Sequence, residues 1–391
     1  MLAPRQRLSR QGRPAWPRAE WRRAFGATHC GNVLEGARNM AVLTSIQLGD
    51  AQRIGREYGL EVVAIRGILA GSVNTNYECS LDTGGRAFLR IYEEQGAEGA
   101  AREIRLLEHL ATRGVPTVRP LRRAAAGDIP VSAGGPAAPT LSSHEGKAAA
   151  MFPWVDGEVL CQKRVTEAVM EQVGSALAKI HLAGADFEGA QHSRFDSAHL
   201  MARIEKLRAQ GHGRAPGQPG GEIAGGEIGA DVERLASRLV AHAERERARD
   251  ARAGAAPSAL VHGDVFRDNV LWHSGQMVAV LDFESASLGS VTFDLCVTML
   301  AWCHGDTLEQ GLARALARGY TRERALTEVD RERLFDDALF AALRFSVTRI
   351  TDYELRPAGT GIYKNYRRFL ARLAFIEALG PAGLPEFLGL V

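Results

Sequence analysis

Apolar and polar residues alternate in three short segments of the first third of the chain, a pattern typical of half-buried β-strands. The segments are residues 62–69, 76–81 and 87–92, and turn-forming residues 82–85 separate the last two. A fourth apolar stretch, residues 147–152, ends at Pro153. Because strands joined by short turns pair antiparallel, these segments predict a small antiparallel sheet.

Apolar residues at helical spacing predict helices in the rest of the chain. One helix is predicted for residues 97–111, between the third and fourth strands. Thr166 can cap another helix, which should end near Gly184. The highly charged residues 231–252 predict a solvent-exposed helix, and further helices are expected from Phe293 onward.

These elements predict an α+β fold with two lobes. The N-terminal lobe, residues 40–152, would hold the antiparallel sheet and one helix. A larger and mainly helical lobe, residues 153–391, would contain a flexible, glycine-rich insertion at residues 210–229. Residues 1–39 lack apolar periodicity and predict a disordered basic extension. We interpret this extension as the result of a start codon assigned upstream of Met40, rather than as a tail that binds RNA or a membrane.

Composition and charge narrow the class of protein. The 391 residues are 46% hydrophobic and 24% charged, which is typical of a globular protein. The net charge of +2 arises in residues 1–39, with eight arginines and two glutamates, so the rest of the chain is slightly acidic and no nucleic-acid partner is expected. The five cysteines are scattered, and no apolar run reaches the roughly 18 residues of a membrane span. The sequence therefore predicts a cytoplasmic protein without a membrane partner.

The clearest chemical signal is a group of polar residues between short predicted strands. His262, Asp264 and Asn269 fit the spacing H-x-D-x4-N, and Asp282 follows thirteen residues after Asn269. This pattern is similar to the catalytic and metal-binding loops of protein kinases. Asp264 is the predicted catalytic base. The oxygen ligands of Asn269 and Asp282 are predicted to bind Mg²⁺ on the phosphates of ATP.

Two further residues are predicted to support this loop. His262 is expected to brace the segment rather than take part in the chemistry. Asp294 lies at the start of a predicted helix, where its carboxylate can accept backbone N–H groups. For Asp294, a role as a helix cap and a role in bracing the loop predict the same kind of contact.

Residues of the N-terminal lobe are predicted to bind the nucleotide, and they are Gly71, Ser72, Asn74, Arg90, Glu103 and Met151. The first three lie in a turn between two strands that can offer backbone N–H groups to phosphates. Arg90 stands where protein kinases carry a phosphate-contacting lysine, and Glu103 is its natural partner. Met151 and its neighbour Phe152 would line the adenine.

These motifs resemble the aminoglycoside-phosphotransferase-like branch of the protein-kinase-like fold, and within it the homoserine kinases. The local matches are Met40-Ala41-Val42, GxxNTNY at residues 71–77, HGDVFRDNVL at residues 262–271, and Leu343-Arg344-Phe345 followed by Thr348-Arg349. The resemblance covers about residues 40–380. It implies a bilobal fold, ATP and Mg²⁺, and phosphorylation of the homoserine hydroxyl in threonine biosynthesis. Arg90 and residues 281–286 depart from the family pattern.

A homoserine acceptor would need an arginine or lysine for its carboxylate, because a buried unpaired charge is costly. Arg344 and Arg349 lie about 140° apart on a predicted helix, so only one of them is expected to face the cleft. We favour Arg349, because Asp352 at i+3 can hold its guanidinium in place. A surface ion pair between these two residues is the alternative, and Arg344 and Arg267 are the next candidates.

Two other functions stay open at this stage. The first is a kinase for another small hydroxylated molecule, such as an aminoglycoside, choline or a thioribose sugar, although the small negative charge of the chain gives a polycationic acceptor weak support. The second is a catalytically inactive regulatory scaffold, for which the absent lysine is the only support. The sequence does not predict the oligomeric state.

Overall fold

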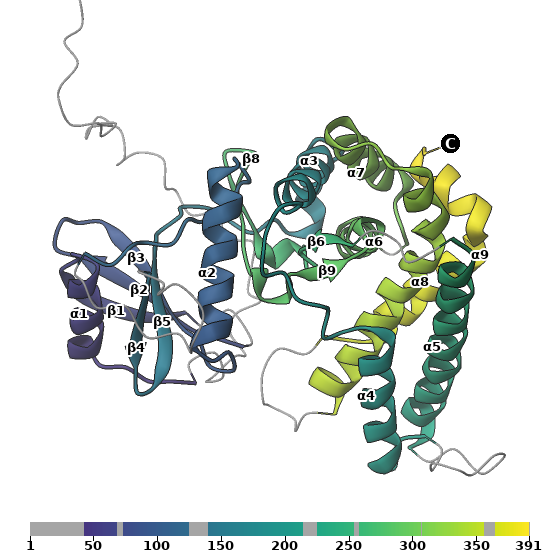
Figure 1. Ribbon diagram of the computed structural model, residues 1–391, viewed down its shortest axis with the longest axis horizontal. Coiled ribbons are helices and arrows are strands. Elements are labelled where there is room, and N and C mark those ends of the chain that lie inside the picture. The colour runs from purple at the N-terminus through teal and green to yellow at the C-terminus, as the bar shows by residue number, and fades with distance from the viewer. Residues whose placement is uncertain are drawn as a thin grey trace, which may run out of the picture. The chain divides into compact units, whose positions relative to one another are not determined.

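Five antiparallel strands form the sheet of the N-terminal part (Figure 1), in the order β1-β2-β3-β5-β4. Their bounds are Val62–Ile68 for β1, Thr75–Leu81 for β2, Arg86–Ile91 for β3, Leu141–His144 for β4 and Lys147–Pro153 for β5. The four predicted strands are confirmed to within one residue at each end. The strand β4 was not predicted, because it is short and polar and pairs only with β5 at the edge of the sheet.

The computed structural model describes residues 43–68, 73–124, 140–213, 225–253, 258–305, 307–355 and 364–390. The predicted extension and most of the predicted insertion lie outside these ranges. The last residues of that insertion belong instead to the helix α5, which begins at Gly226.

The two faces of the sheet are covered by two helices, α1 (Leu48–Glu57) and α2 (Ala97–Thr112), where the sequence predicted only one. Successive side chains of β5 point to opposite faces. Ala149 and Met151 pack in the cluster that contains α1, whereas Ala150 and Phe152 pack in the cluster that contains α2. The helix α1 was missed because only three of its ten residues are buried, and one of the three is Gly55, so few apolar side chains mark its inner face.

The C-terminal part is mainly helical, which confirms the predicted fold class. Its helices are α3 (Glu167–Ala183), α4 (Ser197–Ala209), α5 (Gly226–Ala253), α6 (Val291–Trp302), α7 (Gln310–Glu323), α8 (Glu328–Arg349) and α9 (Arg367–Leu388). Two small antiparallel pairs accompany them, β6 (Ala259–Val261) with β9 (Ser287–Gly289), and β7 (Val270–His273) with β8 (Gln276–Val280). As predicted, Thr166 caps α3, and Gly184 follows its last turn. In the ranges that the structure describes, no helix is both long and apolar enough to cross a membrane.

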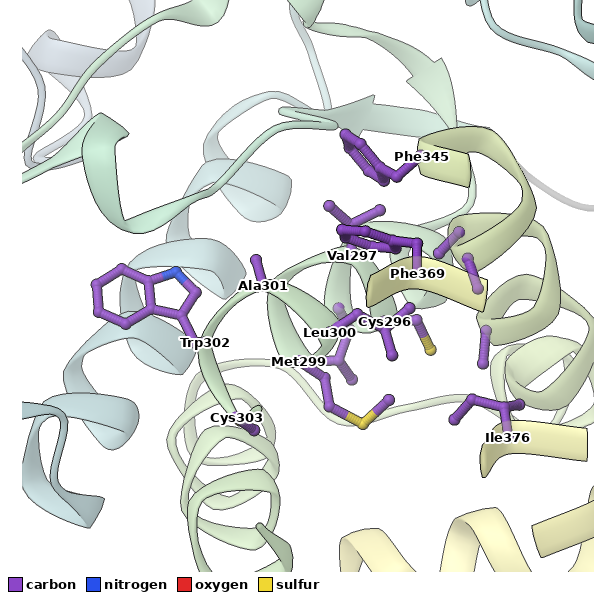
Figure 2. Close-up of a cluster of buried hydrophobic side chains, with 14 of the residues drawn as sticks. Cys296, Val297, Met299, Leu300, Ala301, Trp302, Cys303, Phe345, Phe369 and Ile376 are labelled. Carbon is purple, nitrogen blue, oxygen red and sulfur yellow. The ribbon is translucent and has the colours of Figure 1, made fainter. Parts of the chain in front are cut away.

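The core of this part is built around α6, which is apolar on nearly all sides. Figure 2 shows its side chains surrounded by Phe345 of α8 and by Phe369 and Ile376 of α9. A second close contact joins α3 to α7, where Gly174 faces Gly319 of the other helix. A Cβ atom at either glycine would lie 2.1 Å from a backbone oxygen of the partner helix. The helices can therefore approach this closely only without side chains at these two positions.

The helix α5 extends the predicted charged helix, but it is not solvated on all sides. Val232, Leu235 and Leu239 are fully buried in the C-terminal core. The same face carries His242, whose ring stacks on Phe340 of α8 with 4.7 Å between ring centroids. Most charges of α5 occupy the remaining face, which is the usual arrangement of an amphipathic surface helix, but Asp231 and Arg249 are buried.

The burial of His242 predicts a loss of stability in acid. Burial, together with nearby arginines, lowers the pKa of His242 from 6.5 to about 4. The folded state thus prefers the neutral ring, so this contribution to stability is complete above pH 6.5 and is lost as the pH falls towards 4. The loss amounts to about 3 kcal/mol. We expect urea unfolding of wild type and His242→Phe to show the variant gaining about 2–3 kcal/mol relative to wild type between pH 7 and pH 4.5. An unchanged difference would show that His242 takes up its proton at the same pH in the folded and unfolded states.

Candidate active site

Three polar side chains that are distant in sequence converge at the ends of the short strands. Asp264 follows β6, Asn269 precedes β7 and Asp282 follows β8. The backbone N–H of Leu281 donates to the carbonyl of Asn269 at 2.8 Å, and Asn269 Nδ2 donates to the carbonyl of Asp264 at 2.9 Å. These two bonds fix the spacing of the three residues and leave Asn269 Oδ1 free to accept.

Asp264 has the environment of a base. Burial raises the pKa of this carboxyl group, and the neighbouring charge of Asp282 raises it further, against the opposing effect of Arg344. A carboxylate with a raised pKa takes up a proton more readily than an ordinary one. Its only close side-chain contact among the described residues is the 3.4 Å approach of Asn269 Nδ2 to Oδ2.

The loop is held from behind by Asp294, which is fully buried in the first turn of α6. Its carboxylate accepts the backbone N–H groups of His262 at 2.6 Å and Gly263 at 2.8 Å, and the Nε2–H of His181 at 3.0 Å. Burial alone would raise the pKa of Asp294, but the His181 hydrogen bond and the other donors outweigh it and lower the pKa. Asp294 is therefore placed to brace the loop as an anion.

His262 is also buried and joins two segments of the site. Its Nε2 donates to the carbonyl of Leu281 at 2.9 Å, and its Nδ1 accepts the backbone N–H of Asp264 at 3.2 Å. The ring thus connects the loop to the residue before Asp282 and lies behind the convergence of carboxylates. This position suits the supporting role expected from the sequence.

Arg344 of α8 lies behind the same loop rather than in front of it. Its Nη1 donates to the carbonyl of Gly263 at 2.7 Å, and its guanidinium lies over the rings of Phe195 at 4.2 Å and Phe345 at 4.7 Å. Burial lowers its pKa to about 10. The side chain is 4% exposed. Arg344 was a candidate for binding the acceptor, and its enclosure favours a role in supporting the loop.

A cavity of about 230 Å³ separates the sheet from the loop. Among its lining residues are Phe88, Arg90, Glu103, Phe152, Leu271 and Asp282. Arg90 Nη1 donates to Glu103 Oε1 at 2.9 Å, so the expected pair of arginine and glutamate is formed. The expectation that Met151 lines the nucleotide requires correction, because its side chain points to α1 on the other face of the sheet, and Phe152 lines the cavity.

The turn expected to hold the phosphates is described only from Val73 onward, and Gly71 and Ser72 lie outside the described residues. Asn74 is buried at the end of this turn. Its Nδ2 donates to Glu284 Oε2 at 3.2 Å, and its Oδ1 accepts the backbone N–H of Glu93 at 3.2 Å. Asn74 therefore connects the phosphate turn to the segment that carries Asp282.

Carboxylates outnumber cations in this part of the site. Glu103, Asp282 and Glu284 influence one another electrostatically, and burial with this mutual repulsion raises the pKa of both Glu103 and Glu284. Within the described ranges, Glu103 Oε2 and Glu284 Oε1 are buried without a hydrogen-bond donor, and Arg194 Nη2 lies 3.8 Å from Glu284 Oε1. Carboxylate oxygens gathered in this way favour the binding of a hard cation.

Protein side chains alone do not complete a metal site here. In the part of the chain that the structure describes, no group of three or more His, Cys, Asp or Glu side chains is arranged to hold a metal ion. A cation bound by Asp282 and the amide oxygen of Asn269 would need phosphate and water oxygens for its other positions, which is usual for Mg²⁺ with a nucleotide.

On the acceptor side, Arg349 ends α8 and lies near the loop. Its guanidinium lies 4.4 Å from the ring centroid of Phe369, and its Nη1 donates to the carbonyl of Asn365 at 3.2 Å. The expected pairing with Asp352 is wrong, because Asp352 accepts from Arg203 of α4 at 2.7 Å. Residues 350–354 form a π-helical turn, which changes the angle between positions 349 and 352 from that of a regular α-helix.

Arg267, the third candidate for the acceptor, lies in the short turn between Asp264 and Asn269. Its side chain is half-buried, and burial lowers its pKa. The loop therefore carries both the candidate base and a cation that is partly withdrawn from water.

Comparison with known proteins decides the family. Residues 64–326, more than half of the chain, match the model of the phosphotransferase enzyme family, APH. The chain belongs to this family. Homoserine kinases are among its curated relatives. The enzyme of Methylocella silvestris is 30% identical over 88% of this chain and 98% of its own length, and that of Caulobacter vibrioides is 30% identical over 82% and 92%. The resemblance noted in the sequence is confirmed.

Solved structures of phosphotransferases share the fold. A microcompartment-associated aminopropanol kinase aligns with a TM-score of 0.60 at 15% identity, and covers 88% of this chain and 99% of its own. The spectinomycin phosphotransferase APH(9)-Ia aligns with a TM-score of 0.57 at 12% identity over 88% and 98%. At these identities the comparison establishes the kinase-like architecture and says nothing of the acceptor.

Two residues of this phosphotransferase site were missed by sequence reasoning. Glu284 lies two residues after Asp282, and this spacing could have drawn attention to it. His181 is separated from Asp294 by more than a hundred residues, and its place on the inner face of α3 gave no chemical signal.

Proposed function

We propose that this protein is a homoserine kinase, which transfers the γ-phosphoryl group of ATP to the side-chain hydroxyl of homoserine and forms O-phosphohomoserine for threonine biosynthesis. The observation that carries this proposal is the match to homoserine kinases along nearly their whole length. The convergence of Asp264, Asn269 and Asp282 supports phosphoryl transfer, since this reaction needs an oriented hydroxyl, a base and neutralised phosphates.

The roles of the residues follow from their positions. Asp264 would orient the acceptor hydroxyl and accept its proton. Arg90, held by Glu103, would contact the nucleotide phosphates from the sheet. Asn269 and Asp282 would hold Mg²⁺, which neutralises charge on the triphosphate when it is bound. Residues 40–152 would thus form the nucleotide-binding lobe and residues 153–391 the catalytic and acceptor lobe.

A panel of acceptors tests the proposal. We expect Mg²⁺-dependent ADP release with L-homoserine at a kcat/KM at least about tenfold above that with choline, an aminoglycoside or methylthioribose. Formation of O-phosphohomoserine should be verified by mass spectrometry, and the Asp264→Asn variant serves as the inactive control. Preference for another member of the panel would overturn the acceptor. Inactivity toward the whole panel would favour the regulatory scaffold.

A further inference from the structure

Four arginines gather where α8 ends and α9 begins, beside the candidate catalytic loop. We call Arg267, Arg349, Arg368 and Arg372 the arginine cluster. The guanidinium groups of Arg349 and Arg372 each lie 4.4 Å from the ring centroid of Phe369. Arg368 precedes Arg372 by one turn of α9, and Arg267 contributes from the loop itself. Figure 2 shows Phe369 beside Phe345, above the buried helix α6.

Arg372 is the least explained member of this cluster. It is only 7% exposed, and its Nε is buried without a hydrogen-bond acceptor among the described residues. Among the described residues, the charged groups that influence the pKa of Arg372 are Arg349, Arg368 and Arg267, which are all positive. Burial and this repulsion lower the pKa of Arg372 to about 9. A buried guanidinium with no carboxylate beside it among the described residues destabilises the fold, so a binding role would explain why it is there.

The acidic groups near the cluster leave it with an excess of positive charge. The negative charge of Asp268 favours the charged forms of Arg267 and Arg349. However, Asp268 is exposed, and its Oδ2 lies 3.8 Å from Lys364 Nζ. The negative charge of Asp264, the candidate base, also favours the charged form of Arg349. Among the residues that the structure describes, positive charges therefore exceed negative ones in the cluster, and an anion is the ligand that would balance them.

Arg349 connects the cluster to the candidate base, because the charge of Asp264 acts on its guanidinium. Phe266, two residues after Asp264, has its ring 6.0 Å from the Arg349 guanidinium and 4.9 Å between centroids from Phe345. The rings of Phe266 and Phe369 form the apolar floor on which the guanidinium groups rest. A small acceptor could therefore place its hydroxyl at Asp264 and its anionic group at the cluster.

We propose that the arginine cluster binds the carboxylate of the acceptor and that Arg372 is the residue that selects an acceptor bearing this group. The proposal rests on the proposed function and deepens it, because it gives a reason for the choice of an amino acid. An acceptor without a carboxylate would lack the group that the cluster binds and would gain nothing from Arg372.

Two matched acceptors and one substitution test this proposal. L-Homoserine and 3-aminopropan-1-ol share the hydroxyl and the amine, and only the first has a carboxylate. In Arg372→Met we expect kcat/KM for homoserine to fall about tenfold or more, with kcat/KM for 3-aminopropan-1-ol and KM for ATP nearly unchanged. Arg367→Met is the control, since Arg367 is exposed on the same helix and pairs with Glu227.

Thermal melting separates binding from a structural role. Methionine keeps the apolar stem and removes the buried charge, so Arg372→Met should melt at the same temperature as wild type or higher. A lower melting temperature with equal losses for both acceptors would make Arg372 a structural residue and overturn the proposal, as would an unchanged preference for homoserine. If wild type turns over homoserine and the variant is unaffected, only this proposal fails. If wild type uses no acceptor with a carboxylate, both proposals fail.

Discussion

Replacing Asp264 with Asn is expected to lower kcat by about 10²-fold or more, while the affinity for ATP changes only a few-fold. Asn keeps the shape of the side chain and its contact with Asn269, but it cannot accept a proton. The loop itself should persist, because Asp294, Arg344 and His262 hold it through backbone groups and do not depend on the Asp264 carboxylate. Steady-state kinetics with both substrates, together with ATP binding by calorimetry, measure the two effects.

Asp268→Asn is the matched control for this substitution. Asp268 belongs to the same loop, four residues further on, but its side chain is 63% exposed. We expect its kcat to stay within about twofold of the wild-type value, as is usual for an exposed surface residue. If Asp264→Asn retained more than half of the wild-type activity, Asp264 would not be the base.

The second large effect is expected at Asp282, whose replacement with Asn should abolish most of the Mg²⁺-dependent gain in ATP affinity. Asp282 has a left-handed backbone conformation, with φ 64° and ψ 62°. Asn tolerates this conformation better than Ala does, so the variant removes the charge with little backbone strain. The loss should be about tenfold or more in affinity, the scale of one charged ligand.

Titration calorimetry with ATP, in the presence of Mg²⁺ and after its removal with a chelator, measures this effect. Asp82→Asn is the control, because Asp82 lies in the exposed turn between β2 and β3. We expect the wild type and the control to bind ATP more tightly with Mg²⁺, and Asp282→Asn to bind it almost equally in both conditions. A full metal dependence in the variant would place the cation elsewhere.

The strands and the candidate base could be predicted from the sequence because the information is local. In β5, the apolar run of residues 148–152, which ends at Pro153, is enough to predict a strand. The spacing from Asp264 to Asn269 likewise reflects one short loop. The face of the sheet on which the Met151 side chain lies could not be predicted in the same way. Both faces of this sheet are covered by helices, so an apolar side chain is suitable on either side.

Contacts between segments that are distant in the chain could not be predicted from the sequence. An ion pair between Asp352 and Arg349 was predicted on the assumption of a continuous α-helix. The π-helical turn instead places Asp352 beside Arg203. Arg372 gave no signal, because its unusual environment is created by residues of α8 and of the loop. In both cases the sequence predicts the helix but not the groups that the fold brings next to it.

The bracing of the loop by Asp294, His262 and Arg344 affects the entropy of the reaction. Asp294 and Arg344 tie the backbone around Asp264 to α6 and α8, which belong to the buried core, and His262 ties it to Leu281. The base therefore has little rotational and translational freedom to lose when the acceptor binds, and the entropic part of the activation barrier is reduced before either substrate arrives.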